Sequence, residues 1–490
     1  NLPAMNRGDV VIGAQLSALQ IKADAYSTTT PDTALEVHAV TSGWNKNTVT
    51  WNTKPSYEAE AADFEILKAS QKGTTQIQRN WDVTSIVKRW YENPNFKNYG
   101  FLLRSSAENV AAMNDSCIYA WLYGEKYSQD TSGYPILTIS FRSNKGLESY
   151  WSYTTLSAGR AGTASICDFS GNLVFTHEDS APPGSRAPTS VSHVFNNYMA
   201  AEGFNKLMPY RGHGWMLSCQ QQLLSSSKFG LTASAQQKYP YVYIDGDGTE
   251  HYFLKKSDGT MIDEDGLGLT LTIPKTSNNF YYKVADDTGN AMWFNVAGAL
   301  AKTVDSNGNQ AANYYPSPEV AKINKVTDGA GHALTIAPTG DDLAIQSVTD
   351  TAGRTTNFNW STGRLRNIVY PDGKKTEFAY DGDGAITSVK APDGYELQFS
   401  YTSLANGKRV SKVVEKTPSA TGQTITFDYS QYGATVMRSS GKDGVYGNSD
   451  DILTTTRFDS AGRTVSSEAT CNGKSLGASS AEYTADKANS

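Results

Sequence analysis

The chain has 490 residues, of which 39% are hydrophobic, 11% aromatic and 19% charged, with a net charge of −6. This length predicts roughly two to four domains with hydrophobic cores, and the low charge with 28 Tyr and 42 Gly is typical of β-rich extracellular proteins. The negative net charge without basic runs argues against a nucleic-acid partner, and no apolar run reaches the roughly eighteen residues of a membrane span.

Residues 1–142 carry strand patterns without a fixed period. Apolar side chains alternate along 35–39 and 137–141, and Gly-Phe-Leu-Leu at 100–103 indicates a buried strand. A single short capped helix is expected at 82–90. Many short strands joined by polar loops predict a β-sandwich.

Three motifs follow one another in this region. They are Ser-Gly-Trp at 42–44 with Val-Thr-Trp-Asn-Thr-Lys-Pro at 49–55, Trp-Asp-Val-Thr at 81–84, and Asn-Tyr-Gly-Phe-Leu-Leu at 98–103. In this order they resemble the DNRLRE-type module, a β-jelly-roll found beside Rhs regions and polysaccharide-degrading enzymes. The resemblance implies carbohydrate binding. Some members of this module type bind acidic polysaccharides. The strands that usually open such a module are absent, so we expect residues 1–142 to be N-terminally truncated.

Aromatic residues of this module are the candidates for sugar binding. The tryptophans of the motifs are Trp44, Trp51, Trp81 and Trp90. We interpret these four as core residues, because Trp is highly buried on average and they coincide with fold-defining motifs. Tyr119, Trp121 and Tyr123 alternate on one strand face and form the predicted carbohydrate-binding strip, although an inner sheet face would show the same pattern.

No catalytic constellation is recognisable, and we expect the chain not to be an enzyme. The six histidines are dispersed, and HExxH, GxSxG and phosphate-binding glycine motifs are absent. His177, Glu178 and Asp179 are adjacent, but neighbours on a strand point to opposite faces, so we expect no acid/base pair from this triplet. His213, between two glycines, is expected in a turn. Paired carboxylates brought together in space stay an open alternative.

Four cysteines, Cys117, Cys167, Cys219 and Cys471, lie far apart and match no metal-binding spacing. Free, mostly buried thiols are the main expectation, and one disulfide is the alternative. The chain begins at Asn1 and ends within repeat-like sequence, so we expect a fragment of a longer secreted protein.

The second half of the chain repeats. Asp328, Asp350, Asp372 and Asp393 occur at intervals of 22, 22 and 21 residues, and Phe-x-Tyr at 378–380 recurs at 399–401. A fixed period in this range indicates a repeat architecture. Because Asp-Gly supplies the positive φ of a tight hairpin turn, we expect antiparallel strands with turns at Asp350, Asp372, Asp381 and Asp393.

Apolar pairs spaced i, i+3 recur along the same region. The pairs are Ile323/Val326, Ile345/Val348, Leu365/Ile368, Ile386/Val389 and Val410/Val413. This spacing suits a helix, but the segments are short and flanked by Gly and Pro. A strand with a bulge, or one covered on both faces, is therefore the favoured interpretation, and a helix is the alternative.

Tyr-Asp turns, the period and the Phe-x-Tyr strand ends together resemble the YD repeats of the Rhs family, over roughly residues 147–490. Residues 147–255 resemble the region that leads into such repeats, and 256–490 resemble the repeats themselves. In that family the repeats wind as a continuous β-sheet into a hollow shell. The resemblance therefore implies an all-β fold, with an N-terminal β-sandwich followed by a segment of a YD-repeat shell.

One loop of the repeat region is a candidate calcium site. Asp443, Asn448, Asp450 and Asp451 place several oxygen donors in one Gly-containing loop. Calcium takes six to eight oxygen ligands, but the spacing fits no EF-hand, and a simple turn is the alternative. No other cofactor is expected.

The leading functional hypothesis is a non-catalytic fragment of a secreted or cell-wall-associated bacterial Rhs/YD-repeat protein. Its first module would attach to a polysaccharide or cell-wall glycan, and its repeats would enclose the protein's own C-terminal toxin domain. The alternatives are an accessory carbohydrate-binding region of a polysaccharide-degrading enzyme, and an adhesin. All three imply an extracellular or cell-wall-associated location.

Overall fold

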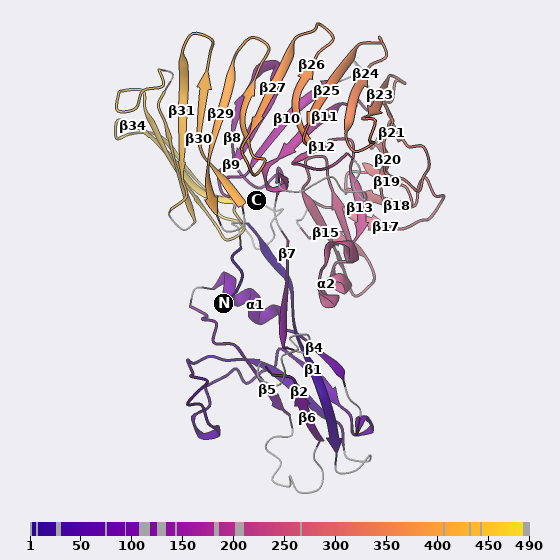
Figure 1. The fold of residues 1–490 in the computed structure, drawn as a ribbon, viewed down its shortest axis with the longest axis vertical. Coiled ribbons are helices and arrows are strands. Elements are labelled where there is room, and N and C mark those ends of the chain that lie inside the picture. The colour runs from indigo at the N-terminus through magenta and orange to yellow at the C-terminus, as the bar shows by residue number, and fades with distance from the viewer. Residues whose placement is uncertain are drawn as a thin grey trace. The chain divides into compact units, whose positions relative to one another are not determined.

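The computed structural model describes residues 2–5, 8–25, 31–73, 76–93, 95–106, 118–124, 134–142, 145–180, 186–200, 210–264, 267–404, 407–430, 433–441 and 443–483. The chain forms two compact units. We call Val10–Arg142 with Ser226–Lys238 the module unit, and Asn1–Asp9, Ser143–Ser225 and Tyr239–Ser490 the repeat unit. Strands make up nearly all regular structure in both (Figure 1), so the predicted all-β fold is confirmed.

The module unit holds two antiparallel sheets. The first consists of β1 (Val10–Ala25), β4 (Ile77–Asp82), β6 (Ile118–Leu122) and β7 (Ile136–Arg142), and the second of β2 (Thr33–Ala39), β3 (Asp63–Leu67) and β5 (Phe101–Ser105). Its helices are α1 (Thr84–Glu92) and α2 (Ala233–Lys238), and the 3-10 helices η1 (Trp51–Thr53), η2 (Ala69–Gln71) and η6 (Ser226–Phe229) also belong to it. The expected short helix and sandwich are both present.

Side chains of β4 join the two sheets of the module unit. The Trp81 ring is fully buried, and its indole N–H donates to the carbonyl of Leu35 on β2 at 2.9 Å. Arg79, also buried, donates to Gln20 on β1 at 3.0 Å and to the carbonyl of Ile66 on β3 at 3.0 Å. Satisfied hydrogen bonds of this kind allow polar atoms to lie in a sandwich core without the cost of an unpaired group.

The repeat unit contains a five-stranded and a 23-stranded sheet, and every strand pair is antiparallel. The five-stranded sheet consists of β8 (Tyr153–Ser157), β9 (Thr163–Cys167), β10 (Leu173–Ser180), β11 (Val191–Asn196) and β12 (Trp215–Leu217), with η4 (Gly159–Ala161) and η5 (Asn197–Met199) in its loops. The long sheet follows the chain without a crossover, and it begins at Gln222, within the range predicted as lead-in.

The strands of the long sheet are β13 (Gln222–Ser225), β14 (Tyr241–Ile244), β15 (Glu250–Lys255), β16 (Met261–Asp263), β17 (Thr270–Thr272), β18 (Tyr282–Ala285), β19 (Ala291–Phe294), β20 (Leu300–Val304), β21 (Gln310–Tyr314), β22 (Lys325–Thr327), β23 (Ala333–Pro338), β24 (Ile345–Thr349), β25 (Thr355–Ser361), β26 (Arg364–Val369), β27 (Lys375–Tyr380), β28 (Ile386–Lys390), β29 (Glu396–Leu404), β30 (Gly407–Lys416), β31 (Thr421–Asp428), β32 (Ala434–Ser439), β33 (Ile452–Phe458), β34 (Thr464–Cys471) and β35 (Lys474–Ser480).

A β-bulge in alternate strands explains the i, i+3 apolar pairs. In β26, Leu365 pairs with Trp360 and Asn367 pairs with Asn359, so Arg366 between them has no register partner. The extra residue shifts the alternation of side chains by one position, so Leu365 and Ile368 lie on the same face of the sheet. Both are fully buried. The same register shift occurs in β24, β28 and β30. The predicted bulge is thereby confirmed.

At five places in the long sheet an aromatic side chain donates to a bulge of an earlier strand. The Tyr380 hydroxyl donates to the Leu365 carbonyl at 2.6 Å, and the Tyr401 hydroxyl donates to the Ile386 carbonyl at 2.6 Å. Trp360, Tyr315 and Tyr429 make the equivalent bond to the first residue of an earlier bulge. The recurring aromatic of the repeat is therefore explained by the backbone carbonyl that a bulge leaves out of the ladder.

Aspartates close the turns at the predicted positions. One carboxylate oxygen of Asp350 accepts the N–H groups of Ala352 and Arg354, both at 2.9 Å, and the other accepts Arg354 Nε at 2.7 Å. The Asp381 turn shows the same pair of backbone bonds. Asp372 and Asp393 each accept one backbone N–H, in turns with Gly at positive φ. Asp side chains favour such turns because they satisfy backbone donors locally.

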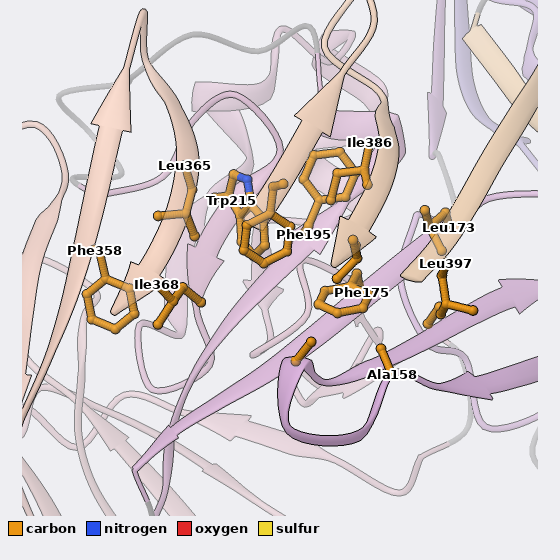
Figure 2. Close-up of a cluster of buried hydrophobic side chains, with 14 of the residues drawn as sticks. Ala158, Leu173, Phe175, Phe195, Trp215, Phe358, Leu365, Ile368, Ile386 and Leu397 are labelled. Atoms are coloured by element: carbon orange, nitrogen blue, oxygen red, sulfur yellow. The ribbon is translucent and has the colours of Figure 1, made fainter. Parts of the chain in front are cut away.

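The five-stranded sheet packs on the apolar face of the long sheet, and together they form the main core (Figure 2). Phe175 on β10 meets Phe378 on β27 with ring centroids 5.8 Å apart, and Trp215 on β12 meets Phe378 at 5.1 Å. Edge-to-face packing of this kind adds to the area that the rings bury. The described thiols of this unit, Cys167, Cys219 and Cys471, are free, and Cys117 lies outside the described residues.

Replacing Tyr401 by Phe should lower the free energy of unfolding by about 1–3 kcal/mol, because it leaves the buried Ile386 carbonyl without its donor. The measurement is urea unfolding followed by tryptophan fluorescence. Tyr314→Phe is the matched control, because its hydroxyl has no hydrogen-bond partner among the described residues. Equal stability of the two variants would contradict the structural role of the Tyr401 bond.

Candidate functional site

The loop between β2 and β3 exposes two of the motif tryptophans. Trp51 is 64% exposed and Trp44 is 49% exposed, so the prediction that these two are core residues is wrong. The Trp44 indole donates to the Tyr99 carbonyl at 2.8 Å, and Lys54 Nζ lies 3.7 Å from the Trp51 ring centroid. The interpretation holds for Trp81, which is buried. Of the motif tryptophans, Trp81 therefore lies in the core, whereas Trp44 and Trp51 lie on the surface.

The Lys54 ammonium gives the Trp51 surface a positive charge. Lys54 follows Trp51 by three residues, and the intervening 3-10 turn η1 brings the two side chains together. The turn is closed by the Thr50 N–H, which donates to the Thr53 hydroxyl at 2.8 Å, and the two threonine hydroxyls lie 2.9 Å apart. An exposed ring beside an ammonium offers an apolar face for sugar C–H groups and a partner for a carboxylate.

The predicted strip on β6 is exposed at its centre. Trp121 is 43% exposed, and it lies opposite Lys22 of β1, whose Nζ is 4.8 Å from the ring centroid. Tyr123 is half-buried, and its backbone N–H donates to the Leu19 carbonyl at 2.9 Å. Tyr119 pairs with Asp24 in the same ladder, but its side chain lies outside what the structure describes. Sugar binding by the three residues stays a prediction.

A third surface lies on the sheet of β3, β2 and β5. Phe64, Glu36 and Arg104 stand opposite one another across the three strands, and Phe64 is 56% exposed. Arg104 donates to the Tyr57 hydroxyl at 2.9 Å. The sequence 63–67 could have indicated a strand that carries Phe64. The strand register that aligns Phe64 with Arg104 cannot be read from the sequence.

The candidate calcium loop is closed by its own hydrogen bonds. The Asn448 amide donates to Asp443 at 2.6 Å, and the Gly447 N–H donates to Asp451 at 2.5 Å. Asp450 N–H donates to the Asn448 side-chain oxygen at 3.1 Å. Among the described residues, no group of three or more His, Cys, Asp or Glu side chains is placed to hold a metal ion. Calcium binding at this loop stays a prediction.

Two of the dispersed histidines share one buried carboxylate. Asp179 accepts from His177 Nδ1 at 2.8 Å and from His193 Nδ1 at 2.6 Å, and all three side chains are buried. The expectation that the 177–179 triplet holds no acid/base pair is wrong, because residues i and i+2 share a strand face. Burial opposes ionisation of Asp179, but the two imidazoles outweigh it and lower the pKa of the carboxyl.

This buried network joins the two sheets of the repeat unit. His177 Nε2 lies 3.0 Å from the Tyr370 hydroxyl, and that oxygen lies 2.7 Å from the Thr376 hydroxyl. The Tyr370 hydroxyl is also 3.0 Å from the Arg160 carbonyl. The side chains of this network are all buried, so the arrangement suits a structural role more than acid/base catalysis on a substrate.

A half-buried carboxylate pair lies in the turn between β14 and β15. Asp247 accepts the N–H and hydroxyl of Thr249, the latter at 2.5 Å, and Asp245 lies 3.1 Å from His251 Nε2. Burial and then the charge of Asp245 raise the pKa of Asp247 to about 7. For Asp245, burial is outweighed by His251, which lowers the pKa. The two carboxyls therefore hold one proton between them over part of the pH range.

Comparison with known protein families finds one match near the N-terminus and one in the repeat unit. Residues 10–116 match carbohydrate-binding module family 96, and residues 359–396 match the RHS repeat. The predicted order, a carbohydrate-binding-type module followed by RHS repeats, is confirmed. None of the helices among the described residues is long and apolar enough to cross a membrane.

Curated proteins of similar sequence include "tRNA nuclease WapA" of Bacillus subtilis and "tRNA3(Ser)-specific nuclease WapA" of Bacillus spizizenii. Each is 24% identical over 304 residues, which is 53% of this chain and 12% of the relative. The chain thus matches about an eighth of the length of these proteins. Among solved structures, "Crystal Structure of TcdB2-TccC3 without hypervariable C-terminal region" aligns with 66% of this chain and 26% of that one, at 11% identity and a TM-score of 0.22.

The raised pKa of Asp247 predicts a loss of stability with rising pH. Because the folded state holds this proton more tightly than the unfolded chain, the contribution is present below the ordinary carboxyl pKa and is lost as the pH rises through about 7. Asp247→Asn should flatten the change in urea midpoint between pH 5 and pH 8. Asp383→Asn, in an exposed turn, is the control, and an unchanged slope in Asp247→Asn would refute the assignment.

Proposed function

We propose that this chain is the attachment and wall segment of a secreted or cell-wall-associated Rhs-type protein, with the module unit binding an acidic polysaccharide or cell-wall glycan. The observation that carries the proposal is the exposure of two tryptophans of the module unit, each beside a lysine ammonium. Trp51 lies within the residues that match a carbohydrate-binding module, and Trp121 lies just after them. Single exposed apolar residues are common on protein surfaces, so the support comes from the pairing of each ring with an ammonium group within this unit.

Charge favours an acidic glycan over a neutral one. Lys54 and Lys22 both lie over aromatic rings, where a carboxylate on a bound sugar would reach the ammonium while the sugar ring packs on the indole. Such contacts are weak singly, because exposed charges are screened by salt. Repeated contacts along a polymer raise the overall affinity by multivalency.

The repeats are proposed to form part of the wall of a shell around a C-terminal toxin domain. Support comes from the uninterrupted order of hairpins in the long sheet and from its one apolar face. The matched relatives carry the name nuclease, but the chain spans an eighth of their length. We therefore assign no catalytic step to this chain. Purified protein should release no reducing ends from polysaccharide and should leave tRNA intact.

Trp121→Ala should weaken retention on a polygalacturonate affinity gel by about fivefold or more, which corresponds to ~1 kcal/mol. Phe141→Ala is the matched control, because Phe141 lies in the same unit with 41% exposure against 43% for Trp121. Trp51→Ala tests the second surface in the same way. Melting temperatures within a few degrees of the parent show that the fold is intact.

If Trp51→Ala and Trp121→Ala are retained as strongly as Phe141→Ala, the module unit does not bind through these rings. If retention on neutral dextran equals that on polygalacturonate, the lysines do not select for acidic sugars. Either result would overturn the corresponding part of the proposal.

A further inference from the structure

Strands β17–β22 of the repeat unit contain no Asp or Glu residue, although the whole chain is net negative. Three lysines lie on these strands, Lys283, Lys302 and Lys325. No ion pair joins any of them to a carboxylate in the described part of the chain, and Lys302 Nζ has only the Gln310 amide oxygen, at 3.3 Å, as a hydrogen-bond partner there. The acidic residues of this stretch lie in the turns between the strands, so the strands themselves carry ammonium groups without an ion-pair partner in the described part of the chain.

Register places the charges and an aromatic ring in one row. Lys283 on β18, Trp293 on β19 and Lys302 on β20 lie directly opposite one another across the three strands. Their neighbours Val284 and Phe294 point to the other face, where they belong to a buried apolar cluster. The row consequently stands on the face of the sheet away from that cluster.

Aromatic rings hold the ammonium groups along this face. Lys302 Nζ lies 4.6 Å from the Phe280 centroid and 5.7 Å from that of Trp293, and Lys283 Nζ lies 5.6 Å from Trp293. Lys325 Nζ lies 4.1 Å from the ring of Tyr314, which is 43% exposed. With strands spaced ~4.8 Å apart, the three lysines are spread over about 19 Å across the strands from β18 to β22. Lys325 lies two residues along β22 from the position in register with Lys302, on the same face.

We propose that this face, formed by Phe280, Lys283, Trp293, Lys302, Tyr314 and Lys325, is a second binding site of the chain, for an anionic polysaccharide of the polyuronate kind. Carboxylates of the polymer would meet the three ammonium groups, and sugar C–H faces would pack on Tyr314 and the rims of Phe280 and Trp293. The site lies on the repeat sheet, so it does not depend on the module unit being a glycan binder.

Charge and geometry favour a polysaccharide over a single-stranded nucleic acid. Strands β17–β22 hold no arginine, the side chain that pairs with phosphate in a bidentate manner and stacks on bases. Binding of single strands also needs open ring faces on which bases stack. Here lysines lie over the rings, and Trp293 and Phe280 are only partly exposed.

Lysines elsewhere on the long sheet differ from this row. Lys390 on β28 stands between Glu377 of β27 and Glu396 of β29 in the ladder. Its charge is therefore compensated by neighbours on both sides. Lys390 and Lys412 together give a control that removes the same charge from the same sheet, without an aromatic row.

The test is affinity electrophoresis of the whole chain in gels containing polygalacturonate, with poly(dT) gels run in parallel. Lys283→Gln/Lys302→Gln should lower retention by about fivefold or more, and Lys390→Gln/Lys412→Gln should lower it by less than about twofold. Lys283→Arg/Lys302→Arg should retain binding, which separates lost charge from a local change of fold. Retention should fall when salt is raised from 0.05 to 0.5 M, because exposed charges are screened.

The same comparison in a Trp51→Ala/Trp121→Ala background isolates the repeat sheet from the module unit. A further drop on adding Lys283→Gln/Lys302→Gln supports a separate site, even if the module unit itself proves not to bind. Equal losses in the row and control variants would reduce the effect to net charge and overturn the proposal. Stronger retention by poly(dT) than by polygalacturonate would also overturn it, in favour of a nucleic-acid surface.

Discussion

The repeat sheet depends on one hydrogen bond that recurs from hairpin to hairpin. A bulge near the start of alternate strands turns both residues of an i, i+3 apolar pair toward the core and leaves a carbonyl out of the ladder. An aromatic residue at the end of the next strand donates a hydrogen bond to that carbonyl, as Tyr380 does to Leu365 and Tyr401 to Ile386. Because the bond joins residues fifteen apart, each hairpin is fixed to its predecessor by a local contact. Long sheets can therefore grow in sequence order.

A sheet built in this way has one apolar face, which must be covered. The five-stranded sheet β8–β12 supplies the cover, and at its centre the fold buries a charge at Asp179. The two histidines that donate to this carboxylate and the Tyr370 hydroxyl beyond them satisfy the network within the protein. A satisfied buried network of this kind specifies how two apolar surfaces align, which apolar contacts alone do less well. On β18–β20, the face away from the apolar cluster carries the lysine row, which we propose as a binding surface.

The sequence period predicted much of this fold. Contacts that depend on which strands pair, and in which register, could not be predicted from it. The interval between Asp328, Asp350 and Asp372 was enough to place the turns, and the i, i+3 spacing was enough to suggest bulges. The exposure of Trp51 could not be predicted, because a tryptophan of the same set of motifs is buried at Trp81. Contacts such as Lys22 with Trp121 or Lys283 with Trp293 depend on strand register, which one sequence does not reveal. The contact between His177 and Asp179 is consistent with their spacing of two, because residues i and i+2 of a strand share a face.

We propose that glycan recognition lies on exposed aromatic and lysine surfaces, whereas the interior of the repeat unit is structural. Hydrogen exchange measured by mass spectrometry on the whole chain, with and without polygalacturonate, tests this most directly. We predict slower exchange in peptides covering 44–54, 118–124 and 280–302, unchanged exchange in 173–179 and 365–380, and no shortening of the polymer. Protection confined to the interior strands, or depolymerisation of the polygalacturonate by the purified chain, would contradict it.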